Sequence, residues 1–408
     1  MNTAEDAHAI DKRAQQIRTV IDQLDHSYRD GERHKPKRTF TNLDNLFKLD
    51  PWIRDRLRFN GLSEVIEWEG ARLRDSHITD IRIAIGRTYG LEYSAQAVYA
   101  MCEQTARQRT YHPIARFLSG LLWDGQPRID GFLSTHIGAV DSEVTRAISR
   151  RWFVSCVARA MGCGEKPVPV HSVLILAGPQ GAGKSTALRL LASDQWFSDS
   201  ALDLRNPKDC YQQIRGNIWI YELAELASTR ARDAETVKAF LSAATDRYRP
   251  AYGKTVVESH RQVIFTGSTN SETFLSDPSG ARRFWPVTVG TIDLEAIKRD
   301  RLMLWAEAVA AFQAGEVWWL SRDEDQALAD MQERYQNVDP WEGSIAAWLP
   351  SQPAGVSVAD ILESAIDMDT DKMHKGHELR VAGILGRLGY TKKRVTRGSS
   401  RVWRWFAA

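Results

Sequence analysis

A glycine-rich segment that begins at Gly178 constrains the fold of this chain more than any other stretch. It reads Gly-Pro-Gln-Gly-Ala-Gly-Lys-Ser-Thr, follows an aliphatic run at 173–176, and precedes a leucine-rich segment at 187–191. This is the strand, glycine turn and helix order that a phosphate-binding loop requires. Because the spacing G-x-x-x-x-G-K-S is complete, we interpret the segment as such a loop rather than as a chance glycine turn.

The positions of this loop have separate chemical roles. The glycines allow backbone amides to curl around phosphates, and the helix that follows adds the positive end of its dipole. Lys184 is expected to reach the β- and γ-phosphates, and Ser185 is expected to hold Mg²⁺. The sequence therefore predicts a site for ATP and Mg²⁺. Its nucleotide-binding residues are Gly178, Pro179, Gln180, Gly181, Ala182, Gly183, Lys184, Ser185 and Thr186.

Two later strands are expected to end in polar residues. The apolar run 216–221 ends in Glu222, and Glu225 lies three residues further on. An acid in this place holds Mg²⁺ through its water shell and polarises the attacking water. We assign the metal and catalytic roles to Glu222; Glu225 shares or exchanges the catalytic role, or one of the two is a surface acid. After the strand at 261–269, Asn270 orients the lytic water, senses the γ-phosphate, or merely caps the next turn.

Two arginines follow in the loop Gly280-Ala-Arg-Arg. Arg282 and Arg283 suit an arginine finger that stabilises the transition state at the ATP of a neighbouring subunit. One of the two is expected to form a structural salt bridge instead, and the sequence leaves open which one.

A basic and aromatic segment lies between the two strands. Residues 246–260 form two extended arms around Gly253 and Lys254, which predicts a β-hairpin. Cations interleaved with aromatic rings suit a phosphate backbone with stacked bases; the alternative is a solvated surface hairpin. The candidate DNA contacts are Arg247, Tyr248, Arg249 and Lys254.

Composition excludes several classes of protein. The 408 residues are 43% hydrophobic and 26% charged, with a net charge of +2. These values are ordinary for a soluble protein of two to three domains, and any nucleic-acid contact must come from local basic clusters. The 14 tryptophans indicate core anchors, a few of which could stack on bases. The four cysteines lack zinc spacing, and the chain shows no signal peptide or membrane span, so we expect a cytoplasmic protein.

The helix and strand patterns divide the chain into five parts. Residues 1–38 are predicted to be a helical and flexible segment, of which 28–38 is a charged linker, and 39–135 a small mainly helical domain. Residues 136–300 form the α/β ATPase core, 301–339 a helical connector, and 340–408 a winged-helix-like domain. Within the second part, Asn42 or Asp44 is expected to cap a helix that runs to Leu49.

The last of these parts ends in a basic segment. Residues 389–405 are predicted to form a hairpin that turns at Gly398-Ser399, and they contain no acid. Amphipathic helices followed by a basic hairpin are typical of a winged helix whose wing contacts phosphates; a solvated hairpin is the alternative. The candidate DNA contacts here are Lys392, Lys393, Arg397 and Arg401.

Five segments of the chain, taken in order, resemble the virulence-associated E (VapE) family, and the resemblance covers residues 110–290. The segments are G-P-Q-G-A-G-K-S-T, W-I-Y-E-L-A-E-L, D-R-Y-R-P-A-Y-G-K, G-S-T-N and G-A-R-R-F-W-P. Members of the family are phage, prophage and pathogenicity-island proteins whose ATPase core is similar to superfamily 3 helicases. The resemblance implies a P-loop core of the AAA+ type, a hexameric ring with ATP between subunits, and a hairpin at 247–260 that grips single-stranded DNA in the pore. It also implies a role in the replication of mobile-element DNA.

These features favour one function over two others. The leading hypothesis is an ATP-dependent DNA helicase or translocase of a phage or mobile element, acting on single-stranded or forked DNA. The alternative is an ATP-regulated DNA-binding protein for recruitment or origin marking that does not unwind. A small-molecule kinase would need an acceptor pocket and lid. Since no paired-carboxylate primase motif precedes the core, we predict no primase activity here and a separate primase as a candidate partner.

Overall fold

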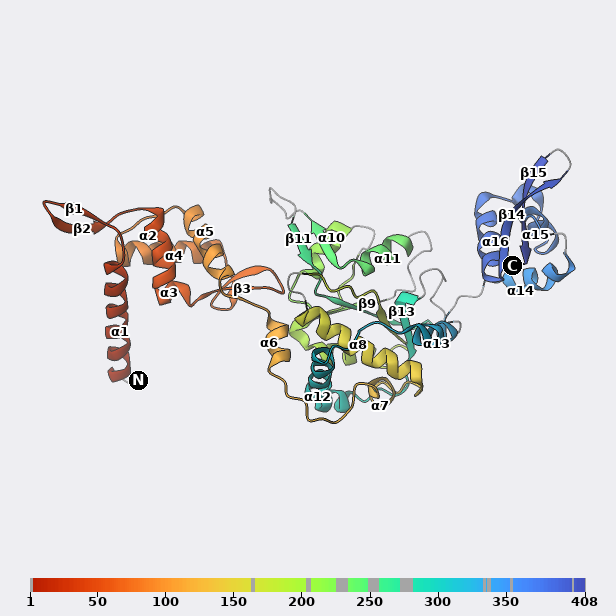
Figure 1. Ribbon diagram of the computed structural model, residues 1–408, viewed down its shortest axis with the longest axis horizontal. Helices are drawn as coiled ribbons and strands as arrows, with labels where there is room; N and C mark the ends of the chain where they lie inside the picture. The colour runs from red at the N-terminus through yellow and green to blue at the C-terminus, as the bar shows by residue number, and fades with distance from the viewer. Residues whose placement is uncertain are drawn as a thin grey trace. The chain divides into compact units, whose positions relative to one another are not determined.

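The computed structural model describes residues 3–162, 166–202, 207–224, 234–248, 257–271, 282–332, 335, 339–352, 355–397 and 400–407. The chain forms two compact units, Met1–Tyr335 and Gln336–Ala408 (Figure 1). None of the helices in the described ranges is long and apolar enough to cross a membrane.

The first unit begins with helices packed on a small sheet whose strand order is β5-β4-β3-β6. Its core is built from apolar side chains of α2, α4 and α5, among them Leu43, Ile81 and Val98. The elements of this region are α1 (Thr3–Asp22), β1 (His26–Arg29), β2 (Glu32–Pro36), α2 (Phe40–Leu49), α3 (Pro51–Arg54), β3 (Leu57–Asn60), β4 (Val65–Trp68), β5 (Ala71–Arg72), α4 (Asp75–Tyr89), α5 (Ala95–Arg107) and β6 (Thr110–Tyr111).

Two local predictions for this region are wrong. The segment expected to be a flexible linker belongs to a hairpin, because β1 pairs antiparallel with β2. Asp30 and Gly31 connect the strands with φ values of 53° and 81°, the left-handed pair that a type I′ turn requires and that Asp-Gly favours. The helix α2 begins earlier than expected, since the hydroxyl of Thr39 accepts a hydrogen bond from the Asn42 amide at 3.1 Å and so caps it.

The centre of the first unit is a five-stranded sheet with the order β13-β7-β12-β9-β8. Every neighbouring pair is parallel, so the carboxyl ends of all five strands lie at one edge. The strands are β7 (Val173–Ala177), β8 (Phe197–Ser198), β9 (Ile220–Ala224), β12 (Ile264–Thr269) and β13 (Phe284–Thr288). The continuous apolar runs in the sequence reflect burial on both faces of this sheet, and the predicted α/β class is confirmed.

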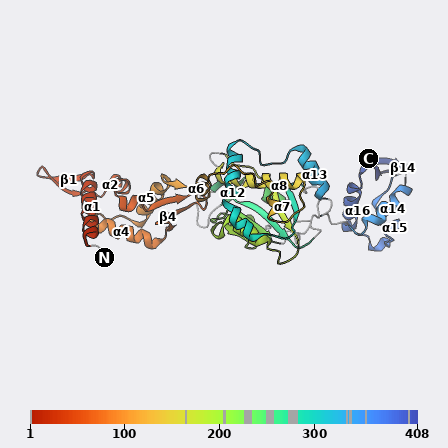
Figure 2. The same ribbon diagram turned by 90° about the horizontal axis from the view of Figure 1, so that it is seen from below.

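Helices cover both faces of the sheet. Leu174 and Leu176 pack with one group of helices, whereas Val173 and Ile175 point to the other, as the two-residue period of a strand requires. Figure 1 shows α8 and α12 on one side and α10 and α11 on the other, and the view from below in Figure 2 shows α7 and α8 over the sheet. The helices around the sheet are α6 (Pro113–Ser119), α7 (Phe132–Thr135), α8 (Glu143–Met161), α9 (Lys184–Ala192), α10 (Pro207–Ile214), α11 (Ala234–Ser242), α12 (Leu294–Gln313) and α13 (Arg322–Gln332).

The basic hairpin that the sequence predicts is present as β10 (Thr245–Tyr248) paired antiparallel with β11 (Val257–His260). A buried ion pair holds its root: Arg261 Nε donates to Asp246 Oδ1 at 3.0 Å. Because removing one member of a buried pair leaves an uncompensated charge, this contact fixes where the two strands leave the core.

The second unit consists of helices followed by an antiparallel hairpin. Its core contains Ile345, Ile361, Val381 and Ile384, and an isolated bridge between Val356 and Trp405 ties the hairpin to the helices. The elements are α14 (Glu342–Trp348), α15 (Val358–Ser364), α16 (Lys375–Arg387), β14 (Tyr390–Arg397) and β15 (Ser400–Ala407).

Candidate nucleotide-binding site

The glycine-rich segment connects β7 to α9 at the carboxyl edge of the sheet. Gly181 and Gly183 have φ values of 80° and 90°, in the left-handed region that glycine enters without strain. Gly178 lies so close to Val289 that a Cβ at that position would be 2.5 Å from its Cγ2. The backbone of the loop therefore requires these three glycines.

Lys184 is the first residue of α9 and is only 7% exposed. Its Nζ donates to Gly178 O at 2.8 Å, to Pro179 O at 2.8 Å and to Asn270 Oδ1 at 3.0 Å. Burial lowers the pKa of Lys184, and the nearby charge of Glu222 partly opposes this effect. Since all three ammonium donors have oxygen partners, a phosphate would bind by taking over some of these hydrogen bonds.

Ser185 and Glu222 form a polar pair beside the lysine. Ser185 Oγ donates to Glu222 Oε1 at 2.7 Å, and the Glu222 side chain on β9 is 1% exposed. Glu222 Oε2 is buried and has no hydrogen-bond partner among the described residues, which is costly unless a ligand supplies one. A hydroxyl and a carboxylate are hard oxygen ligands of the kind that Mg²⁺ prefers, so Ser185 and Glu222 fit a magnesium ion.

Asn270 approaches the same point from the neighbouring strand. It follows β12, which pairs with β7, and the amide of Gly178 donates to Thr269 O at 3.1 Å, so the two strand ends are joined. Asn270 is itself exposed while its Oδ1 accepts from Lys184. The structure thus brings Lys184, Ser185, Glu222 and Asn270 together.

The two arginines lie at the opposite edge of the sheet. They precede β13, whereas the phosphate loop follows β7, and the five residues of β13 span roughly 17 Å. Arg283 Nε donates to Ser242 Oγ at 2.8 Å, but Arg282 is exposed. Neither side chain therefore lies at the glycine-rich loop of its own chain, and Arg282 is the one exposed to solvent.

The remaining expected site residues lie elsewhere. Glu225, Arg249 and Lys254 are outside the described residues. Arg247 on β10 pairs with Glu258 on β11 at 2.9 Å, and Tyr248 is the last residue of β10. In the second unit, Lys392 and Lys393 are exposed on β14, Arg397 ends that strand, and Arg401 lies opposite Thr396.

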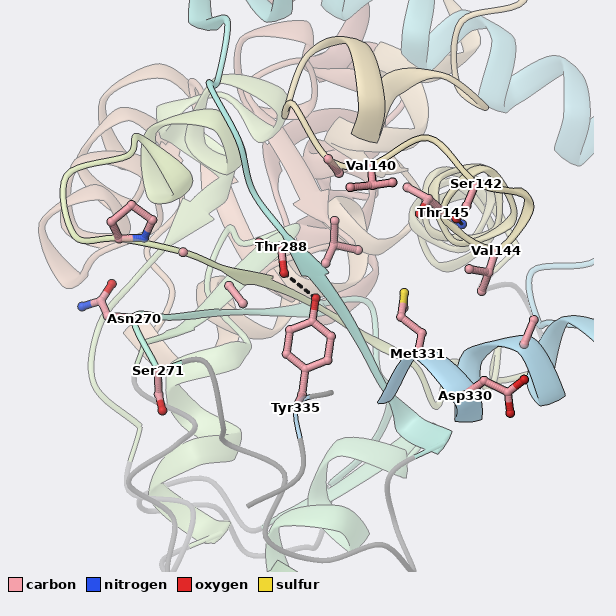
Figure 3. A pocket seen from close by; sticks show the side chains of 16 residues that line it. Val140, Ser142, Val144, Thr145, Asn270, Ser271, Thr288, Asp330, Met331 and Tyr335 are labelled. Atoms are coloured by element: carbon pink, nitrogen blue, oxygen red, sulfur yellow. Dashed lines mark hydrogen bonds between the residues drawn. The ribbon is translucent and has the colours of Figure 1, made fainter. Parts of the chain in front are cut away.

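A cavity of about 760 Å³ opens beside the phosphate loop (Figure 3). Its walls come from the loop before α8 and the start of that helix, the ends of β7, β12 and β13, and α13 with Tyr335. The lining residues are Ala139, Val140, Ser142, Val144, Thr145, Ala177, Gly178, Pro179, Asn270, Ser271, Val287, Thr288, Ala327, Asp330, Met331 and Tyr335.

Two contacts hold the walls of this cavity in place. The hydroxyls of Tyr335 and Thr288 are 2.6 Å apart and share a hydrogen bond, drawn as a dashed line in Figure 3. On the other side, Gly290 N donates to Ile137 O at 3.1 Å, and a Cβ on Gly290 would be 2.3 Å from Gly138 O. This close backbone crossing fixes the segment that begins at Ala139 against the end of β13.

Comparison with protein families decides the identity of the chain. Residues 118–337 match the model of the virulence-associated protein E-like domain, a range that includes the phosphate loop, Glu222, both arginines and the cavity. The chain belongs to the virulence-associated protein E-like family. The resemblance drawn from the five sequence segments is thereby confirmed.

Solved structures similar to this virulence-associated protein E-like chain are distant. The apo structure of the NrS-1 C-terminal region is 12% identical with a TM-score of 0.46, and the match covers 86% of this chain and 96% of that one. A JCV helicase bound to a small molecule is 10% identical with a TM-score of 0.30, covering 68% and 88%. No curated protein matches the chain.

Sequence reasoning missed the cavity of this virulence-associated protein E-like chain. Val140 precedes the phosphate loop by about forty residues, and Tyr335 follows it by about 150, so no short motif contains both. The Gly138–Gly290 crossing that positions one wall also joins segments far apart in the chain. Apart from Gly178, Pro179 and Asn270, the lining residues have no signal in the sequence, and neither does the Tyr335–Thr288 bond.

Proposed function

We propose that this chain is an ATP-dependent DNA helicase or translocase that acts in the replication of phage or mobile-element DNA. The observation that carries the proposal is the group at the start of α9, where Lys184 meets Asn270 and Ser185 meets Glu222. A cation, a hydroxyl and a buried carboxylate with one unpartnered oxygen are the groups that phosphoryl transfer to water needs.

Each of these side chains has a role in that reaction. Lys184 binds the β- and γ-phosphate oxygens in place of some of its present partners. Ser185 and Glu222 hold Mg²⁺, which neutralises phosphate charge when bound. Glu222 orients the attacking water, Glu225 shares that role, and Asn270 reports on the γ-phosphate through its contact with Lys184. Catalysis then consists of positioning and charge stabilisation.

The cavity beside the loop is proposed to hold the base and ribose of ATP. Its volume of about 760 Å³ lies within the usual range of small-molecule sites. Val140, Met331 and Tyr335 supply apolar and aromatic surface for a flat ring, while Ser142 and Asp330 supply polar atoms. This placement puts the phosphates over Gly178 and the base toward α13.

Arg282 is proposed to complete the ATP site of another copy in a ring, hexameric in the family that the chain resembles. Its exposure and its distance from the phosphate loop of its own chain support a role in trans. Arg283 is proposed to support it through its bond to Ser242.

DNA is proposed to meet both hairpins. Arg247, Tyr248, Arg249 and Lys254 contact single-stranded DNA in the pore, and Lys392, Lys393, Arg397 and Arg401 contact it from a winged-helix-like domain. We retain as proposals the division into parts at residues 38, 135, 300 and 339, and a separate primase as partner.

The test is the ATPase rate of the full chain with and without single-stranded DNA. We expect DNA to stimulate the wild type and Lys184→Ala to lower kcat by about 10²- to 10³-fold, as loss of one transition-state donor does. Lys298→Ala is the matched control, because its side chain is 65% exposed on α12. A protein that hydrolyses ATP but neither binds DNA nor separates a forked duplex contradicts the proposal.

An ATP-regulated recruitment or origin-marking protein is the second candidate, favoured by the cationic hairpin in a compact unit of its own. A shortened chain that ends before residue 340 distinguishes the helicase proposal from the recruitment proposal. Unwinding by that shortened chain shows that the core is a motor, whereas loss of all DNA binding favours recruitment.

A further inference from the structure

One tryptophan of the second unit is not used in its core. Trp403 on β15 is 54% exposed, whereas Trp341, Trp348 and Trp405 pack against the apolar cluster of the helices. Exposing half of an indole forgoes the burial that usually accounts for this residue. The packing that accounts for the other three tryptophans therefore does not account for Trp403.

Two cations lie beside this indole. Lys392 Nζ is 5.4 Å and Arg394 Cζ is 6.0 Å from the ring centroid. Arg394 is the direct cross-strand partner of Trp403, and the two-residue period places Lys392 on the same face of the hairpin. The strand register therefore gathers an aromatic ring and two positive charges on one surface.

The charges of this surface are available to a ligand. Lys392 and Arg394 are exposed, and residues 389–408 contain no acid. In contrast, Arg404 on the same hairpin donates to Asp360 Oδ2 at 3.0 Å and is tied to the helices. Within the described ranges, no ion pair engages Lys392 or Arg394, so their charge is presented to solvent.

We propose that this hairpin binds single-stranded nucleic acid by stacking a base on Trp403 while Lys392 and Arg394 contact the flanking phosphates. An aromatic platform beside a cationic track suits single strands, because every unpaired base offers a flat face. A duplex hides those faces in its stack, so the ligand is a free strand or the unpaired arm of a fork. This inference refines the DNA partner of the proposed function and needs no nucleotide.

The first test measures binding of the full chain, without nucleotide, to an oligothymidylate that carries one 2-aminopurine. Stacking on Trp403 quenches the probe, and Trp403→Ala is expected to weaken binding by about 5- to 150-fold, the range for loss of one stacked base. Trp403→Phe keeps a ring and is expected to retain most of the affinity. Trp319→Ala is the matched control, because Trp319 is 55% exposed in the first unit.

The second test separates phosphate contacts from stacking. Lys392→Ala and Arg394→Ala are each expected to reduce the slope of log affinity against log salt by about 0.7, the value for one phosphate contact on a single strand. Trp403→Ala is expected to leave the slope unchanged. Lys375→Ala, an exposed lysine at the start of α16, is expected to change neither slope nor affinity.

The proposed pore hairpin offers a second DNA contact, so each variant is also measured together with Arg247→Ala. The inference is overturned if the Trp403→Ala, Arg247→Ala double variant binds the probe as tightly as the Arg247→Ala single variant. It is also overturned if the hairpin variants lose duplex binding as strongly as single-strand binding. Lys184→Ala is expected to bind the probe like the wild type, so failure of the ATPase proposal would remain distinguishable.

Discussion

The phosphate loop and the C-terminal hairpin are both proposed to present lysine to a polyanion, and their lysines are held in opposite ways. Lys184 is 7% exposed and its ammonium donates to three oxygens of its own chain. Lys392 is exposed at the side of an indole that is itself 54% exposed. One cation is fixed in position before any ligand arrives, and the other is free to adjust.

The difference indicates what each region can do. A buried, fully bonded cation acts at one point in space and contributes to a transition state without reorganising. An exposed cation acts at a range of positions and its attraction is screened by salt. Substitutions at the loop should therefore change rates by orders of magnitude, and those on the hairpin should change affinity and its salt dependence.

The largest expected effect on the ATPase rate comes from Arg282, which is exposed in the single chain but should act at a fixed position, as Lys184 does. Arg282→Ala is expected to lower kcat by about 10³-fold or more, as loss of an arginine finger does, because in the proposed ring Arg282 would complete the ATP site of a neighbouring copy. Arg283→Ala is expected to have a smaller effect on kcat and to reduce thermal stability through loss of the bond to Ser242. Steady-state ATPase assays and thermal unfolding measure the two.

Mixing provides the control for this prediction. Arg282→Ala and Lys184→Ala chains, each strongly impaired alone, are expected to regain part of the activity when combined, because some interfaces then join an intact loop to an intact arginine. Full activity of Arg282→Ala, or no recovery in the mixture, shows that the arginine does not act in trans.

The next effect tests whether burial or charge matters at Glu222. Glu222→Gln keeps the size of the side chain and an oxygen for Ser185, but it removes the charge from a buried position. Hydrolysis is expected to fall by about 10²- to 10³-fold, while ADP binding is retained. Glu295→Gln on α12 is the control and should leave the rate of hydrolysis unchanged, because the Glu295 side chain is 85% exposed. If Glu222→Gln and Glu295→Gln lower the rate by similar factors, Glu222 has no specific role.

The pH dependence of nucleotide binding sharpens the comparison further. Burial lowers the pKa of Lys184, and only the charged form attracts phosphate. Affinity for ADP is therefore expected to fall about tenfold per pH unit above that pKa, and the fall should start below the value of about 10.4 for an ordinary lysine. Lys184→Arg stays charged throughout and should show no such fall; constant wild-type affinity up to the ordinary value contradicts this account.

The smallest effect is expected in the cavity. Tyr335→Phe removes the hydroxyl that bonds to Thr288, and loss of one such bond costs about 1 kcal/mol, or roughly fivefold in ADP affinity. Thr288→Ala should have a similar effect, and the double variant should add little because both remove the same bond. Additive losses measured by calorimetry would show that the two residues act separately.

What the sequence could predict depended on how local each signal was. The phosphate loop and Glu222 carry their chemistry within a few residues of a recognisable strand, so their elements were predicted in the right places. The contact of Arg283 with Ser242 joins residues about forty apart in the chain, and the cavity is lined by segments on both sides of the core, so neither has a local signal. The β1–β2 hairpin was missed because its exposed, charged strands lack apolar alternation, although Asp30-Gly31 is a turn signal.

The uniform direction of the strands has a consequence for assembly. All five strands point the same way, so the phosphate loop lies at one edge of the sheet and Arg282 at the other. A contact that joins these two edges is heterologous, since each copy contributes a different surface, and the first contact leaves one unfilled surface at each end. Further copies can then add to the assembly until the unfilled surface of the last copy binds the unfilled surface of the first. The rotation between neighbours, rather than the strength of any contact, sets whether the product is a closed circle or an open helix.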